Sequence, residues 1–472
     1  MKKSELLEKY ADTIDRMVKR RHTYAEISDL IRDETGIKIG PTQISRFITS
    51  RKRRKKESPH PSSVKTKNST DTITFYKNGT LFCYLTRTES GIYHFSYDEE
   101  YKGKKEFASG IYDKIPPFLE NLLPEGENLR QLEKSVGTKE KFVLLQHLED
   151  SFGAITTTPV AKRVPNFSYN PDSYEETLLS IEDIRLSIPK KIIDSKRFNS
   201  PFSGETRLSK LSGAQPKLSV VFENDELRLQ ENLEYSNAIM KVDNLKFRDL
   251  NLVENMLLSI ARFELGFEVA EAFVVVDRQK EKGFLAGDPI GHFITRRFDR
   301  HPPGKIYDAY ELASLMGIES EHKYSASMEE IFEFLEMKLP PKGIRNIARQ
   351  FAFSYIVGNG DLHVKNIALF KKAGGFTPTP VYDVVNTKIY PSLQKEDLAI
   401  PLNGKTVVTP QEIFSFLSSY LNRGEIREMA ETVNGKYKEY IEATPFETQT
   451  AQSLENFFEN RMDSLHKASF FS

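Results

Sequence analysis

An apolar stretch, FAFSYIVG, runs directly into NGDLHVKN, which places a carboxylate, an imidazole, an ammonium group and an amide close together. Asp361 and Asn366 are separated by four residues in this segment. Phosphoryl transfer needs one carboxylate near the attacking hydroxyl and one neutral oxygen ligand for Mg²⁺ beside the phosphates. A loop of this length can turn both side chains toward one cleft, while His363 and Lys365 support the loop or neutralise the developing charge.

The spacing of Asp361 and Asn366 is that of a protein-kinase catalytic loop. Asp and Asn are also common after an apolar segment, because they cap and turn the chain, and so this loop alone does not decide the chemistry. Asp383 follows 17 residues after Asn366, at the end of the β-type run TPTPVYDVV. A turn could also use an aspartate there, but an unpaired carboxylate between apolar neighbours would be costly. Asp383 is therefore predicted to be a second ligand of Mg²⁺.

Two further groups upstream could bind phosphates. Lys241 lies at the end of the apolar run NAIMK, and Glu254 lies in the helix predicted after it. In kinases, a strand lysine paired with a helix glutamate holds the α- and β-phosphates. A strand lysine that reaches solvent and an exposed helix glutamate would explain the same residues. The turn of small residues at 212–215 could cradle phosphates with its N–H groups, although it contains a single glycine.

Several segments in one order resemble the HipA family of bacterial serine/threonine kinases, the toxins of toxin–antitoxin pairs. The likeness runs from about residue 72 to about residue 440. FLENLLPEGENLRQ resembles the signature of the family's N-terminal domain, and DSFGAITTTPV resembles its D-x-x-G-A segment. LSGAQPKLSV resembles the G-A-Q-x-K phosphate loop, and ITRRFDR the E-R-F-D-R hinge strand. FSYIVGNGDLHVKNIAL resembles the N-x-D-x-H-x-K-N loop, and VYDVVN the Y-D-V metal motif.

The resemblance implies a role for each matching residue. Asp361 would be the catalytic carboxylate, Asn366 and Asp383 the Mg²⁺ ligands, and Lys241 the lysine on the phosphates of ATP. The phosphate loop and the hinge would supply the remaining nucleotide contacts, from Gly213, Ala214, Gln215, Lys217, Arg297 and Phe298. Pro216 and Arg296 stand where the family often has Glu, which suggests a different nucleotide affinity. The protein substrate would be an aminoacyl-tRNA synthetase or another translation protein.

In this family a serine just before the G-A-Q turn can be autophosphorylated, which expels the loop and switches the enzyme off. Ser212 directly precedes Gly213 and is the favoured site here, and Ser209 is the alternative. A phosphate on Ser212 would gain charge-assisted contacts with neighbouring lysines such as Lys217 and remodel the loop.

Residues 1–57 differ from the rest of the chain in charge. They hold 16 Lys and Arg against 9 Asp and Glu, a net charge of +7 that the remaining residues balance with −7. Apolar residues recur at helical spacing over 4–22, in YAEISDLIRDET after Thr23, and in PTQISRFITSRKRR after a GIKIG turn. Helix, short turn and helix is the helix-turn-helix layout, whose second member enters the major groove of DNA.

The outer face of the third helix and the basic run behind it are the predicted contacts with double-stranded DNA: Thr42, Gln43, Ser45, Arg46, Thr49, Arg51, Lys52, Arg53 and Arg54. If the whole run RKRRKK met phosphates, the slope of log K against log[salt] would be about −5. The run alone would then bind DNA too weakly at physiological salt, and so a homodimer is expected to share the operator. A solvated charge run closing a helical bundle, or a docking module for a partner protein, would give the same pattern.

The composition is that of a multidomain protein of the cytoplasm. The chain has 472 residues and a single cysteine, Cys83, which excludes an internal disulfide and a cysteine-based zinc site. Its apolar runs fall short of the roughly 18 residues that a membrane span needs. The charged N-terminal segment also lacks the apolar core of a secretory signal, and so a bacterial cytoplasmic location is expected.

The predicted fold class is α+β, with a small all-α helix-turn-helix head before a two-lobed fold of the HipA and protein-kinase type, β-rich in its N-lobe and mainly helical in its C-lobe. The predicted domains are the DNA-binding domain 1–57, a flexible linker 58–71, the HipA N-terminal subdomain and kinase N-lobe 72–305, and the helical kinase C-lobe 306–472. The more local expectations are a hairpin at Asn78-Gly79, helices over 115–150, a β-rich zone at about 205–300, and short strands near 367–371 and 378–385.

The sequence therefore predicts an ATP- and Mg²⁺-dependent protein serine/threonine kinase with a fused DNA-binding domain for autoregulation. HipA-type kinases are commonly paired with a separate helix-turn-helix antitoxin, and here the head would supply that module within one chain. Two alternatives stay open: a DNA-binding regulator whose kinase fold only senses nucleotide, and a small-molecule phosphotransferase on the same core. The intact Asp361, Asn366 and Asp383 argue against the first.

Overall fold

The computed structural model describes part of the N-terminal head and most of the chain from residue 71 on. The described residues are 10, 13–14, 24–35, 37, 39, 44, 71–148, 150–159, 162–167, 178–180, 184–187, 217–231, 234–243, 247–277, 290–302, 304–393 and 396–468. The chain divides into two compact units, residues 1–68 and 69–472. The finer domain boundaries given above stay predictions.

The N-terminal unit contains the helix predicted after Thr23, which runs as α3 from Tyr24 to Thr35. Its apolar face packs into a small core formed by Ile14, Ile27, Ile31, Ile39 and Ile44. The first and third predicted helices of the head fall mainly outside the described residues. The helix-turn-helix arrangement therefore stays a prediction.

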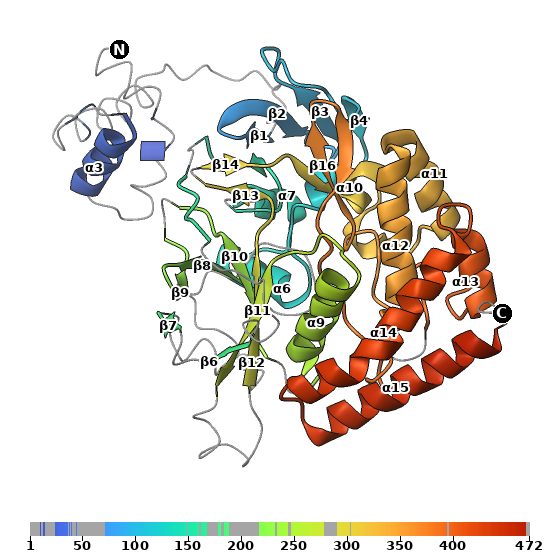
Figure 1. Ribbon diagram of the computed structural model, residues 1–472. Coiled ribbons are helices and arrows are strands. Elements are labelled where there is room, and N and C mark those ends of the chain that lie inside the picture. The colour runs from blue at the N-terminus through green and yellow to red at the C-terminus, as the bar shows by residue number, and fades with distance from the viewer. Residues whose placement is uncertain are drawn as a thin grey trace. The chain divides into compact units, whose positions relative to one another are not determined.

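The larger unit begins with an antiparallel sheet of strand order β4-β3-β2-β1-β5, followed by short helices (Figure 1). The hairpin predicted at Asn78-Gly79 is confirmed, and both residues have positive φ angles. The elements of this region are β1 (Asp71–Lys77), β2 (Thr80–Arg87), β3 (Tyr93–Tyr97), β4 (Gly110–Tyr112), α5 (Pro117–Glu120), α6 (Gly126–Val136), α7 (Lys141–Leu145) and β5 (Ile155–Thr156).

A second sheet has the order β6-β11-β12-β10-β8-β9-β7, with parallel pairs at its two ends. Because side chains alternate along a strand, β8 and β10 turn Leu218, Val220 and Met240 into one apolar cluster and place Lys217 and Lys241 on the opposite face. The two lysines are direct cross-strand partners. The strands are β6 (Leu178–Ser180), β7 (Arg185–Leu186), β8 (Lys217–Glu223), β9 (Glu226–Leu229), β10 (Ala238–Lys241), β11 (Ala272–Asp277) and β12 (Ile290–Arg296).

Helix α9 (Leu250–Ser259) packs against β11 and β12 and continues into one π-helical turn, η2 (Ile260–Glu264) (Figure 1). Two small sheets follow, built from β13 (Arg300–His301), β14 (Lys305–Ile306), β15 (Ala309–Glu311), β16 (Ala368–Lys372) and β17 (Gly375–Pro378). The prediction of a strand near 378–385 is wrong in its position, because the strand of this region, β17, ends at Pro378. Beyond that residue Val381 forms an isolated bridge with Val269, and the prolines at 378 and 380 offer no N–H for a longer ladder.

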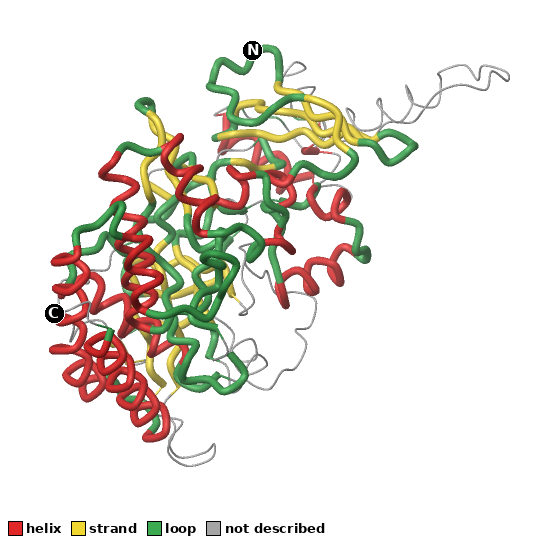
Figure 2. Tube along the Cα trace, turned by 90° about the vertical axis from the view of Figure 1, so that its right-hand side faces the viewer, coloured by secondary structure: helices red, strands yellow, loops and turns green. Residues whose placement is uncertain are grey.

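From residue 312 the unit is mainly helical, as predicted, and Figure 2 shows most of these helices near the C-terminal end of the chain. The helices are α10 (Leu312–Met316), η4 (Ser320–His322), α11 (Met328–Lys338), α12 (Pro341–Val357), α13 (Pro410–Leu417), α14 (Arg423–Ala443) and α15 (Thr448–Lys467). Apart from η4, they share one apolar core with α9 and the first sheet. Within the described ranges, no helix combines the length and apolar character needed to cross a bilayer.

Gly153 marks a close approach between the segment after α7 and strand β15. Its φ angle is +74°, and an added Cβ would collide with the backbone oxygen of Ala309. Gly137, at the C-terminal end of α6, has a similar φ angle of +82° but no atom within 4 Å of the position of its Cβ. A comparison of the same substitution at the two glycines therefore separates the free-energy cost of the backbone conformation from the cost of the steric conflict.

The substitution Gly153→Ala is expected to lower the free energy of unfolding by roughly 3 kcal/mol, because about 1–2 kcal/mol of left-handed strain adds to a backbone displacement of about 1–3 kcal/mol. Gly137→Ala is the matched control and should lose about 1–2 kcal/mol from the strain alone. Urea unfolding followed by circular dichroism measures both losses. Equal losses in the two variants would contradict the steric contact at Gly153.

Candidate active site

Helix α12 delivers the segment NGDLHVKN to a fixed place. The helix ends at Gly358, which adopts φ +74°, and the N–H of Asn359 donates to the Ser354 carbonyl at 2.8 Å. The N–H of Gly360 donates to the Thr387 hydroxyl at 3.0 Å, and a side chain at Gly360 would collide with that hydroxyl. The chain is thus held on both sides of the turn that leads into Asp361.

The loop from Asp361 to Asn366 closes on itself through hydrogen bonds. The side-chain amide of Asn366 donates to the Asp361 carbonyl at 2.9 Å, and the Asn366 N–H donates to the His363 carbonyl at 2.8 Å. Since the amide nitrogen of Asn366 is used in this way, its orientation is fixed. The amide oxygen is then the atom that Asn366 can offer to a cation.

His363 supports this loop as a neutral imidazole. Its Nδ1 accepts a hydrogen bond from the Lys365 N–H at 3.2 Å, and the ring is 3% exposed. Burial, with the nearby Lys323 ammonium, lowers the pKa of His363 to about 3. Because the ring is uncharged at pH 7, its contacts favour the supporting role among the two roles predicted for it.

Lys365 ties the loop to segments far away in the sequence. Its buried ammonium lies 3.0 Å from Glu311 on β15, 3.5 Å from Glu125 and 3.1 Å from the amide oxygen of Asn121. Burial opposes its charge, but the two carboxylates raise the pKa of Lys365. Sequence reasoning missed all three partners. The signal for Asn121 and Glu125 was their place as polar residues within the apolar run FLENLLPEG.

A buried ion triad joins the second sheet, α9 and the segment after β17. The Lys241 ammonium donates to Glu254 at 2.6 and 2.7 Å and to Asp383 Oδ1 at 2.6 Å. Lys241 and Glu254 are 3% and 1% exposed, so neither the solvent-reaching lysine nor the exposed glutamate considered above is present. The predicted strand-to-helix ion pair therefore exists, and Asp383 joins it.

Asp383 has the φ angle of +57° that Asp and Asn tolerate better than other side chains. The neighbouring Tyr382 hydroxyl donates to the Lys365 carbonyl at 2.9 Å and so fixes this segment to the loop at 361–366. Burial alone would raise the pKa of Asp383, but Lys241 and Lys217, the latter at 3.7 Å, hold it far below its usual value. Asp383 is therefore a paired carboxylate that stays ionised.

Asp361 lies close enough to this triad for the Asp383 charge to act on it. Burial, with the repulsion from Asp383, raises the pKa of Asp361 to about 6. Its Oδ1 accepts a hydrogen bond at 2.9 Å from the hydroxyl of Tyr324, in the loop before α11. Sequence reasoning missed Tyr324, because it lies 37 residues from Asp361 and outside every motif.

The described site residues meet around one small cavity of about 70 Å³. It is lined by predicted site residues from six elements or loops: Lys217, Lys241, Glu254, Arg297, Phe298, Lys365, Asn366 and Asp383. A larger hollow of about 980 Å³ lies beside it, and among the described site residues Phe298 lines both. Asp361 and His363 adjoin the small cavity through the loop described above.

Arg297 belongs to a buried cluster of four charges. Arg297 and Arg300 each contact Asp150 and Asp299, at 2.8–2.9 Å, and all four residues are 4% exposed or less. The cluster joins the D-x-x-G-A segment to the residues after β12. The guanidinium group of Arg297 is engaged in this cluster, and so its predicted contact with nucleotide stays a prediction.

The remaining predicted residues lie outside the described part of the chain. This holds for Gly213, Ala214 and Gln215 of the phosphate loop, for Ser209 and Ser212, and for all nine predicted DNA contacts.

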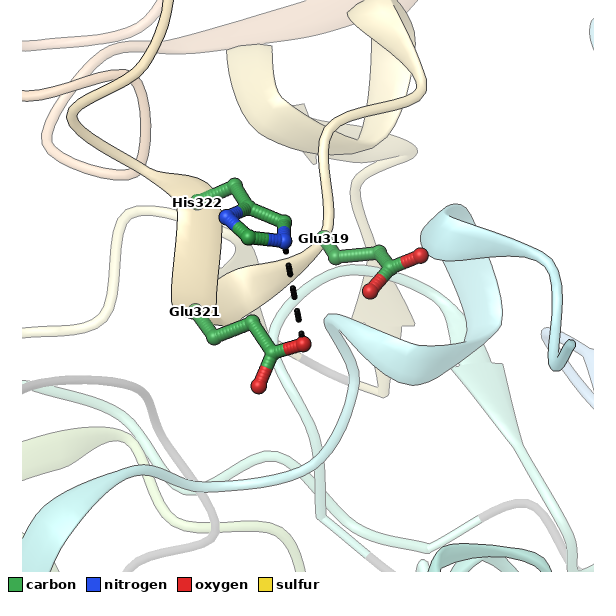
Figure 3. Close-up of side chains that lie close together, drawn as sticks. All are labelled: Glu319, Glu321 and His322. Carbon is green, nitrogen blue, oxygen red and sulfur yellow. Dashed lines mark ion pairs between the residues drawn. The ribbon is translucent and has the colours of Figure 1, made fainter.

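A second group of acidic and imidazole side chains lies on one short surface segment, at Glu319, Glu321 and His322 (Figure 3). Glu319 forms an ion pair with Lys114 at 3.2 Å, and Glu321 approaches His322 at 3.8 Å. Glu321 and His322 are mostly exposed, and exposed charges of this kind are ordinary on a protein surface. The group adds nothing to the cavity.

Comparison with known proteins places this site in a family. Residues 209–448 match the family described as HipA-like C-terminal domain. The chain is 27% identical to the serine/threonine-protein kinase toxin HipA of Shewanella oneidensis over 337 residues, which cover 66% of this chain and 71% of that protein. It is 28% identical to the putative kinase Y4dM of Sinorhizobium fredii over 298 residues, 60% of this chain and 65% of that protein. These relatives support a kinase-like function at the level of the family.

The fold has a counterpart among solved structures. A chain in the Shewanella oneidensis MR-1 complex of HipA, HipB and operator DNA superposes with a TM-score of 0.59 at 19% identity, covering 84% of this chain and 97% of that chain. At this identity the likeness concerns the fold alone. It confirms the predicted α+β class, with sheets in the N-terminal region and helices in the C-terminal region.

The substitution Asp150→Ala is expected to lower the free energy of unfolding by about 3–5 kcal/mol, because it leaves two buried guanidinium groups without one of their partners. Asp71→Ala removes an exposed ion pair with Arg87 and should cost at most about 1 kcal/mol. Guanidinium chloride unfolding compares the two variants. A loss at Asp150 no larger than that at Asp71 would show that the buried cluster does not stabilise the fold.

Proposed function

This chain belongs to the family of proteins with a HipA-like C-terminal domain, and on that premise we propose that it transfers the γ-phosphoryl group of ATP to a serine or threonine hydroxyl of a protein. The observation that supports the proposal most is the triad in which Lys241 joins Glu254 and Asp383 beside Asn366. An ion pair between a strand lysine and a helix glutamate, with an aspartate nearby to bind the metal, is the arrangement that phosphoryl transfer by kinases requires.

In this proposal Asp361 accepts the proton of the attacking hydroxyl. With a pKa of about 6 it is ionised at pH 7, and it is still basic enough to take a proton as the oxygen attacks. His363 and Lys365 hold the loop that carries it, the first through the Lys365 N–H and the second through Glu311. Their part is therefore positioning.

Lys217 and Lys241 would hold the phosphates of ATP, since both ammonium groups face the same cavity from neighbouring strands. Asp383 and Asn366 suit a divalent cation such as Mg²⁺. Asp383 stays ionised, and the amide nitrogen of Asn366 is engaged elsewhere, which leaves its oxygen for a hard cation. A cation bound there would neutralise charge on the transferring phosphoryl oxygens.

Removing either carboxylate should abolish most of the activity. Asp361→Asn, which keeps the shape of the side chain but cannot take a proton, is expected to slow phosphoryl transfer about a hundred- to ten-thousandfold. Asp383→Ala is expected to have an effect of similar size, because it removes an anionic ligand and a partner of Lys241. The measurement is transfer of radiolabel from ATP to the chain itself and to added proteins.

Asp463→Asn, an exposed carboxylate on α15, is the matched control and should leave transfer unchanged. Mass spectrometry of the labelled chain would locate the acceptor. Phosphate on Ser212, or on Ser209, would support autoregulation by the phosphate loop. Label on metabolites alone would favour a small-molecule phosphotransferase, and no transfer to any acceptor would favour a nucleotide sensor.

We further propose that residues 1–57 bind double-stranded operator DNA. The support is the net charge of +7 in this segment and the helix α3 with its small apolar core. The solved HipA relative was crystallised in a complex with HipB and operator DNA. In the present chain the DNA-binding module would be part of the same polypeptide.

Replacing Arg51, Lys52, Arg53 and Arg54 together by Gln should weaken DNA binding and make it less dependent on salt. If each side chain neutralises one phosphate, the slope of log K against log[salt] becomes less steep by about 3 to 4. Fluorescence anisotropy with a labelled promoter fragment between 50 and 200 mM salt measures this. Lys436→Gln with Lys438→Gln, two exposed lysines of α14, is the control. Equal slopes in the wild type and the head variant would contradict DNA contact by this run.

A further inference from the structure

The loop between α10 and α11 brings a side chain of its own to the candidate catalytic carboxylate. The Tyr324 hydroxyl donates to Asp361 Oδ1 at 2.9 Å, and its ring forms a T-shaped contact with the His363 ring, with 5.1 Å between the centroids. Tyr324 is 45% exposed, and so its ring lies between the loop at 361–366 and solvent. The hydroxyl thus reaches Asp361 from the side that an external molecule would use.

This loop is held by two carboxylates of the FLENLLPEG segment, the buried Glu120 and the half-buried Glu125. The N–H of Ser320 donates to Glu120 at 2.9 Å, and the Lys323 ammonium contacts Glu125 at 2.8 Å. Glu125 also lies 3.5 Å from Lys365 of the catalytic loop. Burial opposes its charge, but the two lysines lower the pKa of Glu125 to about 2. The ionised Glu125 contacts one lysine from each loop, and it therefore holds the loop that carries Tyr324 next to the loop that carries Asp361.

The hydrogen bond between Tyr324 and Asp361 resembles the one that a phosphate-accepting hydroxyl makes to the catalytic base of a kinase. A kinase carboxylate accepts a hydrogen bond from the hydroxyl that attacks the γ-phosphorus. The phenol of Tyr324 makes this hydrogen bond to Asp361. Three other tyrosines among the described residues donate to carboxylates at similar distances: Tyr84 to Asp98 at 2.8 Å, and Tyr420 to Glu336 and Tyr440 to Glu264 at 2.9 Å. None of these carboxylates belongs to the loop at 361–366.

We propose that Tyr324 is an internal phosphoacceptor, modified once by the active site of its own chain; this rests on the kinase function proposed above. The phenolic oxygen forms a bond to the γ-phosphorus of ATP. The bond between that phosphorus and the oxygen bridging to the β-phosphate breaks, and ADP leaves with the electron pair. The phenolic proton passes to the Asp361 carboxylate.

Phosphorylation also changes what Tyr324 does next. The phosphotyrosine carries nearly two negative charges and stands beside Asp361 and Asp383, which repel it. The adjacent Lys323 and the exposed position of the ring allow the modified side chain to turn outward. Asp361 is then free to accept a hydrogen bond from an external serine or threonine hydroxyl.

The test incubates the full-length chain with ATP and Mg²⁺ and maps phosphate by mass spectrometry. Phosphate is expected on Tyr324 in the wild type, with at least tenfold higher occupancy than on Tyr84 or Tyr420. The rate constant should be independent of protein concentration over a hundredfold range, because the acceptor belongs to the same chain. Asp361→Asn, prepared in parallel, should lose the modification and so exclude a contaminating kinase.

Tyr324→Phe keeps the ring against His363 and removes only the hydroxyl, and Tyr420→Phe is its matched control. The first variant should lose phosphotyrosine, and the second should retain it. Phosphate on serine or on an added protein with Tyr324 unmodified would overturn this proposal and leave the kinase function standing. Similar labelling of Tyr84, Tyr324 and Tyr420, or a rate that rises with protein concentration, would also overturn it. Absence of phosphate from the chain and from every added protein would overturn both proposals.

Discussion

The ammonium group of Lys241, held between Glu254 and Asp383, is the interaction on which the arrangement of the site depends. It joins three separate parts of the chain: a strand of the second sheet, a buried helix and the segment after β17. A buried charge that loses its partner costs several kcal/mol, and so none of the three can move away alone. Lys217, 3.7 Å from Asp383, adds a second lysine to this group, and all four side chains line the same small cavity.

Features that depend on near neighbours could be predicted from the sequence. The hairpin at Asn78-Gly79 and the lysine at the end of β10 follow from turn residues and alternation along a strand. The motifs also selected Lys241, Glu254 and Asp383 before their contacts were known. The ion pair of Lys241 with Asp383 spans 142 positions, however, and spacing carries no information about such a contact. The misplaced strand near 378–385 failed for a local reason, since prolines interrupt its ladder.

The roles of side chains within the site were harder to predict than their places. The segment NGDLHVKN left two roles open for His363 and Lys365, which were to support the loop or to neutralise developing charge. Only the surroundings of the two side chains in the fold decide between these roles. The imidazole loses its proton because it is enclosed, whereas the ammonium of Lys365 keeps its charge because Glu311 and Glu125 enclose it. Both of these carboxylates lie outside NGDLHVKN. A motif therefore identifies the residues of a site, and the distant segments packed around it determine their protonation.

Each group proposed to act on a substrate already contacts another side chain of the same chain. Lys241 lies on Asp383, where a cation would bind, and Tyr324 donates to Asp361, where an acceptor hydroxyl would bind. Lys241 and Asp383 both line the cavity of about 70 Å³, and so a nucleotide and its cation bound there must compete with the contact between these two side chains. Lys241 can turn from Asp383 to the phosphates and keep Glu254, which leaves no buried charge unpaired. Asp361 has no such second partner among its described side-chain hydrogen bonds, and for this reason the departure of Tyr324 has to be coupled to the arrival of another hydroxyl or to a change in Tyr324 itself.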